Sequence, residues 1–302
     1  MDKLLVNPGT RRAMAVSATL LTAGFALAAA GTTGADAAAD STHQRSYVAL
    51  GDSYASAPLI PTQIDARCLR SNQNYPSLAA EATGAALTDV SCAGATTAHM
   101  RTAQGSAPAQ LDALSRSTDA VTVTIGGNDI GFSAVLRTCA SVSASDPDGA
   151  PCRAHFTGTG TDAITRSVRQ TAPKVAQVLR DIHRRSPHAR VVVVGYPDLF
   201  PDDGLGCTSA AVPLAAGDFS YLRDKEKELN TMLARQARRH GASYVDTYRP
   251  TVGHDLCRPT DTRWIETFAP ERPAAPVHPN ALGEKAMARA VGRALSSSSW
   301  PR

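Results

Sequence analysis

The chain has 302 residues, with 31 Lys and Arg against 27 Asp and Glu, which gives a formal net charge of +4 at pH 7. So small an excess argues against a nucleic-acid partner, because nucleic-acid-binding domains carry a strongly basic face. The length is enough for one sizeable core or two small ones. Beyond the N-terminal region no segment approaches the ~20 apolar residues that a membrane span needs, so no stable membrane anchor is expected.

The N-terminus has the layout of a secretory signal peptide. Arg11-Arg12 precede the apolar run AMAVSATLLTAGFALAAA, and Ala35-Asp36-Ala37 offers an A-x-A cleavage site. An uncleaved membrane anchor is the alternative, but the run is short and rich in alanine. We therefore predict a cleaved signal peptide over residues 1–37, by a Sec or twin-arginine route, and a secreted, extracellular single domain over 38–302.

Six cysteines follow the predicted cleavage site. An even number of cysteines in an exported chain indicates disulfides. There is no C-x-x-C pair, which argues against a zinc site or a redox motif, and the sequence predicts neither a metal nor a cofactor. Six cysteines allow 15 pairings. The simplest joins neighbours in order: Cys68–Cys92, Cys139–Cys152 and Cys207–Cys257.

Apolar runs alternate with segments of helical periodicity along this region. Long helical patterns cover residues 164–186, 219–241 and 280–295. Strands alternating with helices predict an α/β fold with a parallel sheet covered on both faces. The predicted strands are Tyr47–Gly51, Ala86–Ser91, Ala120–Ile125, Val191–Gly195 and Ser243–Asp246.

Polar residues gather where the predicted strands end, and open parallel sheets bind ligands at that edge. The first strand ends in Gly51-Asp52-Ser53. The second leads into SCAGATT with Gly94, and the third into GGND with Asn128. A fourth feature, His278-Pro279-Asn280, opens the last helix. Each of these four sequence features is weak evidence alone, but the four together in this order are unlikely to arise by chance.

These four blocks resemble those of the GDSL or SGNH hydrolases, and among them the secreted actinobacterial lipases and esterases. The resemblance covers nearly all of the chain after residue 37. It implies a flavodoxin-like, three-layer fold with five parallel strands in the order 2-1-3-4-5. It also implies a carboxylic-ester hydrolase, foremost a triacylglycerol lipase acting on fatty acyl esters without a cofactor, and disulfides that pair in sequence order.

The resemblance also implies roles for individual residues. Ser53 is the nucleophile and His278 the general base. The oxyanion hole comprises the backbone N–H groups of Ser53 and Gly94 and the side-chain amide of Asn128. The chemistry suits these residue types, because a serine hydroxyl needs a neighbouring base and a developing oxyanion needs fixed N–H donors. The G-x-S-x-G signature of α/β-hydrolases is missing.

The chain departs from the wider family at Ala275. Most members have an aspartate three residues before the histidine. Here we expect the backbone carbonyl of Ala275 or Pro276 to orient His278, which makes the predicted catalytic unit a Ser–His dyad. Such a carbonyl fixes the tautomer but adds no full charge.

Other residues admit a second interpretation. Asp52 is predicted to be a turn residue, Asp129 to hold its own turn, and the pair His254-Asp255 to be structural. Apolar residues in 57–65 and 131–136 are candidates for either an acyl pocket or ordinary core.

Several functions remain open from the sequence. The same catalytic residues would serve a carbohydrate or aryl-ester deacylase or a phospholipase. A non-catalytic binding protein is disfavoured because the set of Ser, Gly, Asn and His is intact. We expect a monomer acting on a small acyl ester or a lipid.

Overall fold

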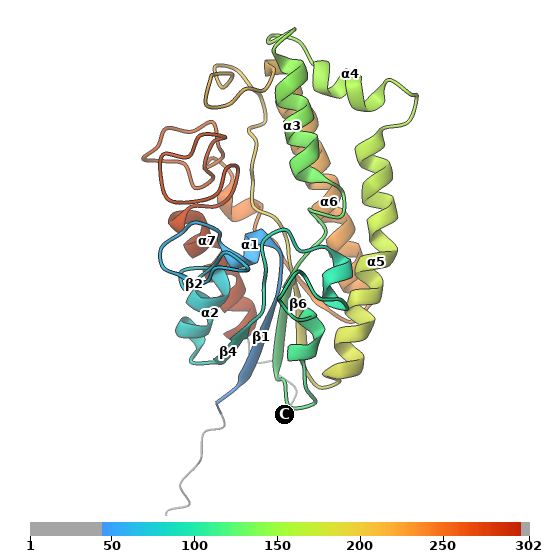
Figure 1. The fold of residues 1–302 in the computed structure, drawn as a ribbon, viewed down its shortest axis with the longest axis vertical. Coiled ribbons are helices and arrows are strands. Elements are labelled where there is room, and N and C mark those ends of the chain that lie inside the picture. The colour runs from blue at the N-terminus through green and yellow to red at the C-terminus, as the bar shows by residue number, and fades with distance from the viewer. Residues whose placement is uncertain (1–43, 297–302) are drawn as a thin grey trace, which may run out of the picture. The chain divides into compact units, whose positions relative to one another are not determined.

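A parallel sheet of five strands forms the centre of the computed structural model, which describes residues 44–296 (Figure 1). The predicted signal peptide over 1–37 lies outside the described residues. The order β4-β1-β5-β6-β7 confirms the predicted order 2-1-3-4-5, because β2 (Gln63–Asp65) and β3 (Arg70–Ser71) form a separate antiparallel hairpin. The sheet consists of β1 (Ser46–Gly51), β4 (Ala86–Asp89), β5 (Ala120–Thr124), β6 (Arg190–Val194) and β7 (Ser243–Val245).

Helices cover both faces of the sheet, as the alternation in the sequence predicted. On one face the strands pack against α3 (Phe132–Ser143), α5 (Ala163–Arg185) and α6 (Phe219–Arg239). On the other they pack against α2 (Tyr75–Thr83) and α7 (Ala281–Ser296). The short helices are α1 (Ser53–Ser56), α4 (Pro151–Thr157) and the 3-10 turns Thr97–Met100, Gln110–Ala113, Ala216–Asp218 and Arg249–Thr251.

The central strands are buried on both sides, and their side chains divide between two cores. Val48 and Leu50 of β1 face the α3–α5–α6 core, whereas Tyr47 and Ala49 face the α2–α7 core. This is the two-residue alternation of a strand. On the α2–α7 side of β5, the polar residue Thr122 is buried, and its hydroxyl is bonded to the Tyr47 hydroxyl at 2.7 Å. A buried hydroxyl is tolerated when it has such a partner.

Three disulfides join Cys68 to Cys92, Cys139 to Cys152 and Cys207 to Cys257. The first holds the loop that follows β4 against the β2–β3 hairpin. The second links α3 to α4, and the third ties the loop after β6 to the loop after β7. The first and the third join irregular segments at the edge of the sheet, where few regular hydrogen bonds hold the chain.

Candidate active site

The turn after β1 places Ser53 at the start of α1, facing a pocket. Asp52 caps this short helix, because its Oδ1 accepts the N–H of Tyr54 at 3.0 Å. Only glycine fits at Gly51, since a Cβ there would lie 2.7 Å from Ala55 Cβ and 2.9 Å from the Thr124 carbonyl oxygen. The tight packing of Gly51 against β5 therefore fixes the direction in which Ser53 leaves the sheet.

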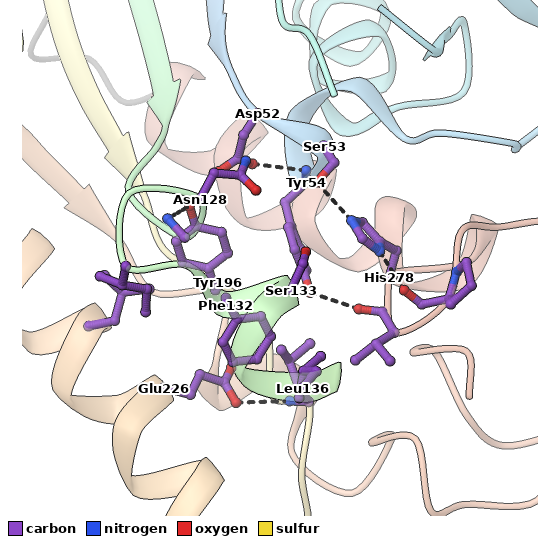
Figure 2. Close-up of a pocket in the computed structure, with 16 residues that line it drawn as sticks. Asp52, Ser53, Tyr54, Asn128, Phe132, Ser133, Leu136, Tyr196, Glu226 and His278 are labelled. Atoms are coloured by element: carbon purple, nitrogen blue, oxygen red, sulfur yellow. Dashed lines mark hydrogen bonds between the residues drawn. The ribbon is translucent and has the colours of Figure 1, made fainter. Parts of the chain in front are cut away.

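His278 lies directly against Ser53, although 225 positions separate them in the sequence. The distance from Ser53 Oγ to His278 Nε2 is 2.7 Å, and that from Nδ1 to the Pro276 carbonyl oxygen is 2.8 Å (Figure 2). A carbonyl oxygen can only accept, so Nδ1 carries the proton of the neutral ring. Nε2 is then the acceptor that the serine O–H needs.

The sequence allowed either the Ala275 or the Pro276 carbonyl to orient His278, and the structure shows that Pro276 bonds to its ring. The Ala275 carbonyl instead accepts the backbone N–H of His278 at 3.2 Å. Within residues 44–296, Pro276 is the only partner of Nδ1, and no carboxylate bonds to it. Burial lowers the pKa of His278, and the bond to the Pro276 carbonyl opposes this only in part. The ring is therefore neutral at pH 7.

Tyr54 braces the segment that carries the histidine. Its ring stacks on the His278 ring, with centroids 4.7 Å apart, and its hydroxyl donates to the Val277 carbonyl at 2.7 Å. Val277 has φ 59°, a left-handed conformation that is costly for a β-branched residue. A bond from Val277 N–H to the Thr267 carbonyl also holds this conformation.

The predicted oxyanion donors lie on loops that are bonded to each other. Asn128 Nδ2 donates one hydrogen to the Ala95 carbonyl at 2.9 Å, which fixes the amide and leaves its second hydrogen available. Among the described residues, the backbone N–H groups of Ser53 and Gly94 have no protein acceptor. Ser53 and Asn128 line the pocket wall, whereas Gly94 lies outside it.

We expected Asp129 to hold its own turn, but the structure shows a different role. Its carboxylate instead accepts the backbone N–H of Thr97 at 2.9 Å and the hydroxyl of the same residue. It thereby joins the Asn128 turn to the loop that carries Gly94. The sequence could not reveal this bond, because the two loops follow β4 and β5, which are brought close only by pairing with opposite sides of β1.

Tyr196 is a site residue that the sequence analysis missed. Its hydroxyl accepts the Gly127 N–H at 2.8 Å and donates to Asp52 Oδ2 at 2.6 Å. Burial raises the pKa of Asp52 to about 7, although the Tyr196 and Tyr54 hydrogen bonds oppose the rise. Tyr196 follows the end of β6, so the strand-end argument applied to the fourth strand would have found it.

The pocket beside Ser53 and His278 has a volume of about 580 Å³, including its open mouth. Phe132 and Leu136 of α3 line it, together with Leu199 and Leu229, so the predicted segment 131–136 does reach the pocket.

The segment 57–65, the other candidate for an acyl pocket, does not line this pocket. This part of the chain instead packs Ile60 into a small separate cluster with Ala57 and Ala274.

Two further histidines, His99 and His254, make contacts away from Ser53. His99 accepts the Thr96 N–H at 3.0 Å, and His254 stacks on Trp264 while bonding the Thr262 carbonyl at 2.7 Å. No group of three or more His, Cys, Asp or Glu side chains in residues 44–296 is arranged to hold a metal ion. In the same region no helix is long and apolar enough to cross a membrane.

Comparison with known proteins points to one family. Residues 49–286 match the GDSL-like lipase/acylhydrolase family. The chain is 42% identical to Lipase 2 of Streptomyces coelicolor, over 93% of this chain and 96% of that protein.

Two solved structures are similar along most of the chain. One is phospholipase A1 of Streptomyces albidoflavus, with 28% identity, a TM-score of 0.69 and coverage of 84% of this chain and all of that one. The other is an extracellular lipase of Streptomyces rimosus, with 29% identity, a TM-score of 0.68 and the same coverage. The chain therefore belongs to the GDSL-like lipase/acylhydrolase family and is a hydrolase of the lipase/esterase class.

Proposed function

We propose that the protein is a secreted serine ester hydrolase that cleaves fatty acyl esters with a Ser53–His278 dyad. The observation that carries the proposal is the chain of contacts from Ser53 Oγ through the His278 ring to the Pro276 carbonyl, 2.7 and 2.8 Å long. A hydroxyl, a neutral imidazole and a fixed acceptor behind it are the arrangement that nucleophilic catalysis by serine requires.

Acylation proceeds by attack of Ser53 Oγ on the ester carbonyl carbon. The serine proton passes to His278 Nε2, and the carbonyl oxygen becomes an oxyanion held by the N–H groups of Ser53, Gly94 and Asn128. Collapse of this intermediate breaks the bond to the alcohol oxygen, which takes the proton from Nε2. The alcohol leaves, and the acyl group remains on Ser53.

Deacylation repeats the sequence with water. His278 Nε2 removes a proton from the water as its oxygen attacks the acyl-enzyme carbonyl, and then returns that proton to Ser53 Oγ. The fatty acid leaves, and the neutral enzyme is restored. The Pro276 carbonyl keeps the ring oriented throughout and stabilises the imidazolium less than a carboxylate would.

Two features favour fatty acyl substrates, and triacylglycerol among them. The pocket next to Ser53 is lined by Phe132, Leu136, Leu199 and Leu229, which suits an aliphatic chain. Two of the three similar proteins named above are called lipases, and the third is called a phospholipase A1. Secretion is supported by the signal-peptide pattern over 1–37 and by three disulfides, which form in oxidising compartments. We further propose that residues 38–302 form one domain that acts as a monomer.

A phospholipase is the second candidate, and the similarity to a phospholipase A1 favours it over a sugar deacylase. The test is a panel of nitrophenyl esters, a triacylglycerol, a phosphatidylcholine and an acetylated sugar, assayed with wild type and Ser53→Ala. The proposal expects fatty acyl ester hydrolysis that disappears in the folded variant. Cleavage of the acetylated sugar alone would contradict it.

A further inference from the structure

A buried glutamate, Glu226 of α6, lines the same pocket as Ser53 and His278. It is 3% exposed. Its Oε2 accepts the Leu199 N–H at 3.2 Å, whereas its Oε1 has no protein hydrogen-bond partner among the described residues. Figure 2 shows Phe132 between this carboxyl and Ser53, with Leu136 beside the carboxyl. An acyl chain attached to Ser53 would therefore pass apolar side chains before it meets Glu226.

Burial favours the neutral form of the Glu226 carboxyl. Burial raises its pKa well above the ordinary range and the nearby Asp198 raises it further, whereas the hydrogen bond from the Leu199 N–H and the charge of Lys227 oppose the rise only in part. The neutral acid group has an O–H donor as well as acceptor oxygens. An unpaired polar atom of this kind is expensive to bury, and the cost disappears when a ligand atom pairs with it.

Another glutamate shows that burial alone does not imply a ligand. Glu284 of α7 is also fully buried, its Oε2 accepts the Tyr75 N–H at 2.7 Å, and its Oε1 lacks a protein partner. It packs between α2 and α7, outside the pocket. What distinguishes Glu226 is its place in the wall of the pocket that holds Ser53, and Glu284 serves as a matched control.

We propose that Glu226 is a specificity-determining residue that recognises an oxygen atom carried by the acyl chain at the depth where the chain reaches α6. The proposal rests on the proposed ester hydrolysis at Ser53 and concerns which acyl groups that site prefers. Hydroxy- or oxo-acyl esters of the matching length would pair with the carboxyl. A purely aliphatic chain of that length would leave it unpaired.

The test compares two series of nitrophenyl esters, one with n-alkyl acyl chains and one with ω-hydroxy chains, from butyrate to laurate. A hydroxyl buried against leucine and phenylalanine is penalised, so the kcat/KM ratio of hydroxy to alkyl ester should be low at most lengths. At the length that reaches Glu226 we expect the ratio to rise about tenfold, the size of one net hydrogen bond.

Three variants test whether Glu226 causes this rise in the kcat/KM ratio. Glu226→Leu should abolish it, Glu226→Gln should keep it because an amide also donates and accepts, and Glu284→Gln should leave the wild-type profile in place. A ratio that varies smoothly with length in wild type overturns the proposal even if Glu226→Leu does not fold. Persistence of the rise in folded Glu226→Leu also overturns it. Hydrolysis that survives Ser53→Ala would instead contradict the proposed function, so the two failures are distinguishable.

Discussion

At the scale of single residues, the site depends on groups whose protonation is set by burial. Asp52 is buried and His278 is half-buried in the pocket wall, and burial favours the neutral form of each, lowering the pKa of the histidine and raising that of the aspartate. No carboxylate bonds to the His278 ring among the described residues, and burial moves its pKa below the ordinary range of a histidine.

The pH dependence of kcat/KM should show this shift. A general base must be neutral, so activity rises as the pH climbs through the pKa of His278 in the free enzyme. Because burial lowers that pKa, the acid limb should lie below the ordinary value of about 6.5. The measurement is kcat/KM for a nitrophenyl ester across acidic and neutral pH. An acid limb above about 6.5 would mean that a nearby anion raises the pKa of His278.

Tyr196→Phe tests the hydrogen bonds that join the turn carrying Ser53 to the turn carrying Asn128. The variant removes the donor to Asp52 and the acceptor of the Gly127 N–H. We expect kcat to fall about tenfold or more, less than the 10²–10³ of a lost oxyanion donor, with little change in KM. Tyr47→Phe is the control, because it removes a similarly buried hydroxyl bond, to Thr122, away from the pocket. Equal losses of kcat in both variants would assign Tyr196 to stability alone.

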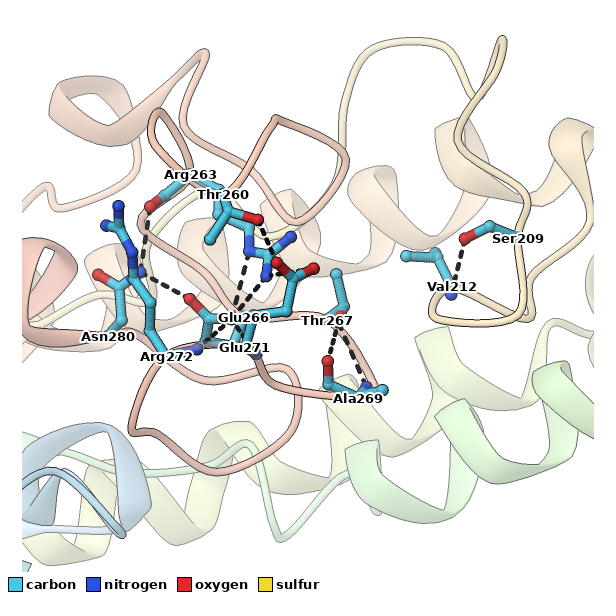
Figure 3. A network of polar contacts seen from close by, with 10 residues as sticks. All are labelled: Ser209, Val212, Thr260, Arg263, Glu266, Thr267, Ala269, Glu271, Arg272 and Asn280. Carbon is cyan, nitrogen blue, oxygen red and sulfur yellow. Dashed lines mark hydrogen bonds and ion pairs between the residues drawn. The ribbon is translucent and has the colours of Figure 1, made fainter.

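At the scale of elements, the loop between β7 and α7 carries the general base and is held by a buried ion pair. Glu266 is fully buried and accepts bonds from the Arg263 guanidinium and from Asn280 Nδ2 (Figure 3). Its backbone N–H donates to the His278 carbonyl at 2.9 Å. The loop therefore positions His278 through main-chain contacts, although it contains several acidic residues.

Glu266→Gln should destabilise the fold rather than remove a catalytic group. Breaking one side of a buried ion pair costs about 3–5 kcal/mol. The bonds from Asn280 and Arg263 lower the pKa of Glu266 despite its burial. Its stabilisation is therefore present above the unfolded pKa and lost as pH falls through the folded pKa. Urea denaturation at several pH values should show wild type losing this advantage in acid. A variant as stable as wild type at pH 7 would contradict the account.

Substitution of three other carboxylates in this loop distinguishes a Ser53–His278 dyad from a catalytic triad. Asp255, Asp261 and Glu271 make no contact with His278 Nδ1, which bonds to Pro276. Asp255→Asn, Asp261→Asn and Glu271→Gln should each keep most of the turnover, whereas His278→Ala should lose nearly all of it. Turnover of folded variants, checked by circular dichroism, decides the matter. One carboxylate variant that falls as far as His278→Ala would reveal a third catalytic member.

At the scale of the whole molecule, the disulfides stabilise the connecting segments around a sheet that is already well packed. Loop-closure entropy predicts about 3 kcal/mol for a short enclosed loop and about 4 kcal/mol for a long one. Cys207–Cys257 encloses 50 positions of sequence and Cys139–Cys152 only 13. The Cys207→Ala/Cys257→Ala variant should therefore lower Tm more than Cys139→Ala/Cys152→Ala. The reverse order in calorimetry would contradict the entropic account.

Much of the fold follows from the sequence because its strands and long helices have strong periodicity. The strand order came from the family resemblance and agrees with the structure. The helices α1 to α4 and the β2–β3 hairpin were not predicted, since each is shorter than the three long helices that the sequence does predict. The bonds of Tyr196 and Asp129 depend on contacts between distant loops, which no local pattern encodes.

Covalent labelling tests the central claim most directly. An organophosphonate reacts with a serine only where a neighbouring base and an oxyanion hole activate it. We predict one adduct per chain, located at Ser53 by peptide mass spectrometry, absent in Ser53→Ala and strongly slowed in His278→Ala. An adduct at any other serine, or undiminished labelling of the Ser53→Ala variant, would contradict the account.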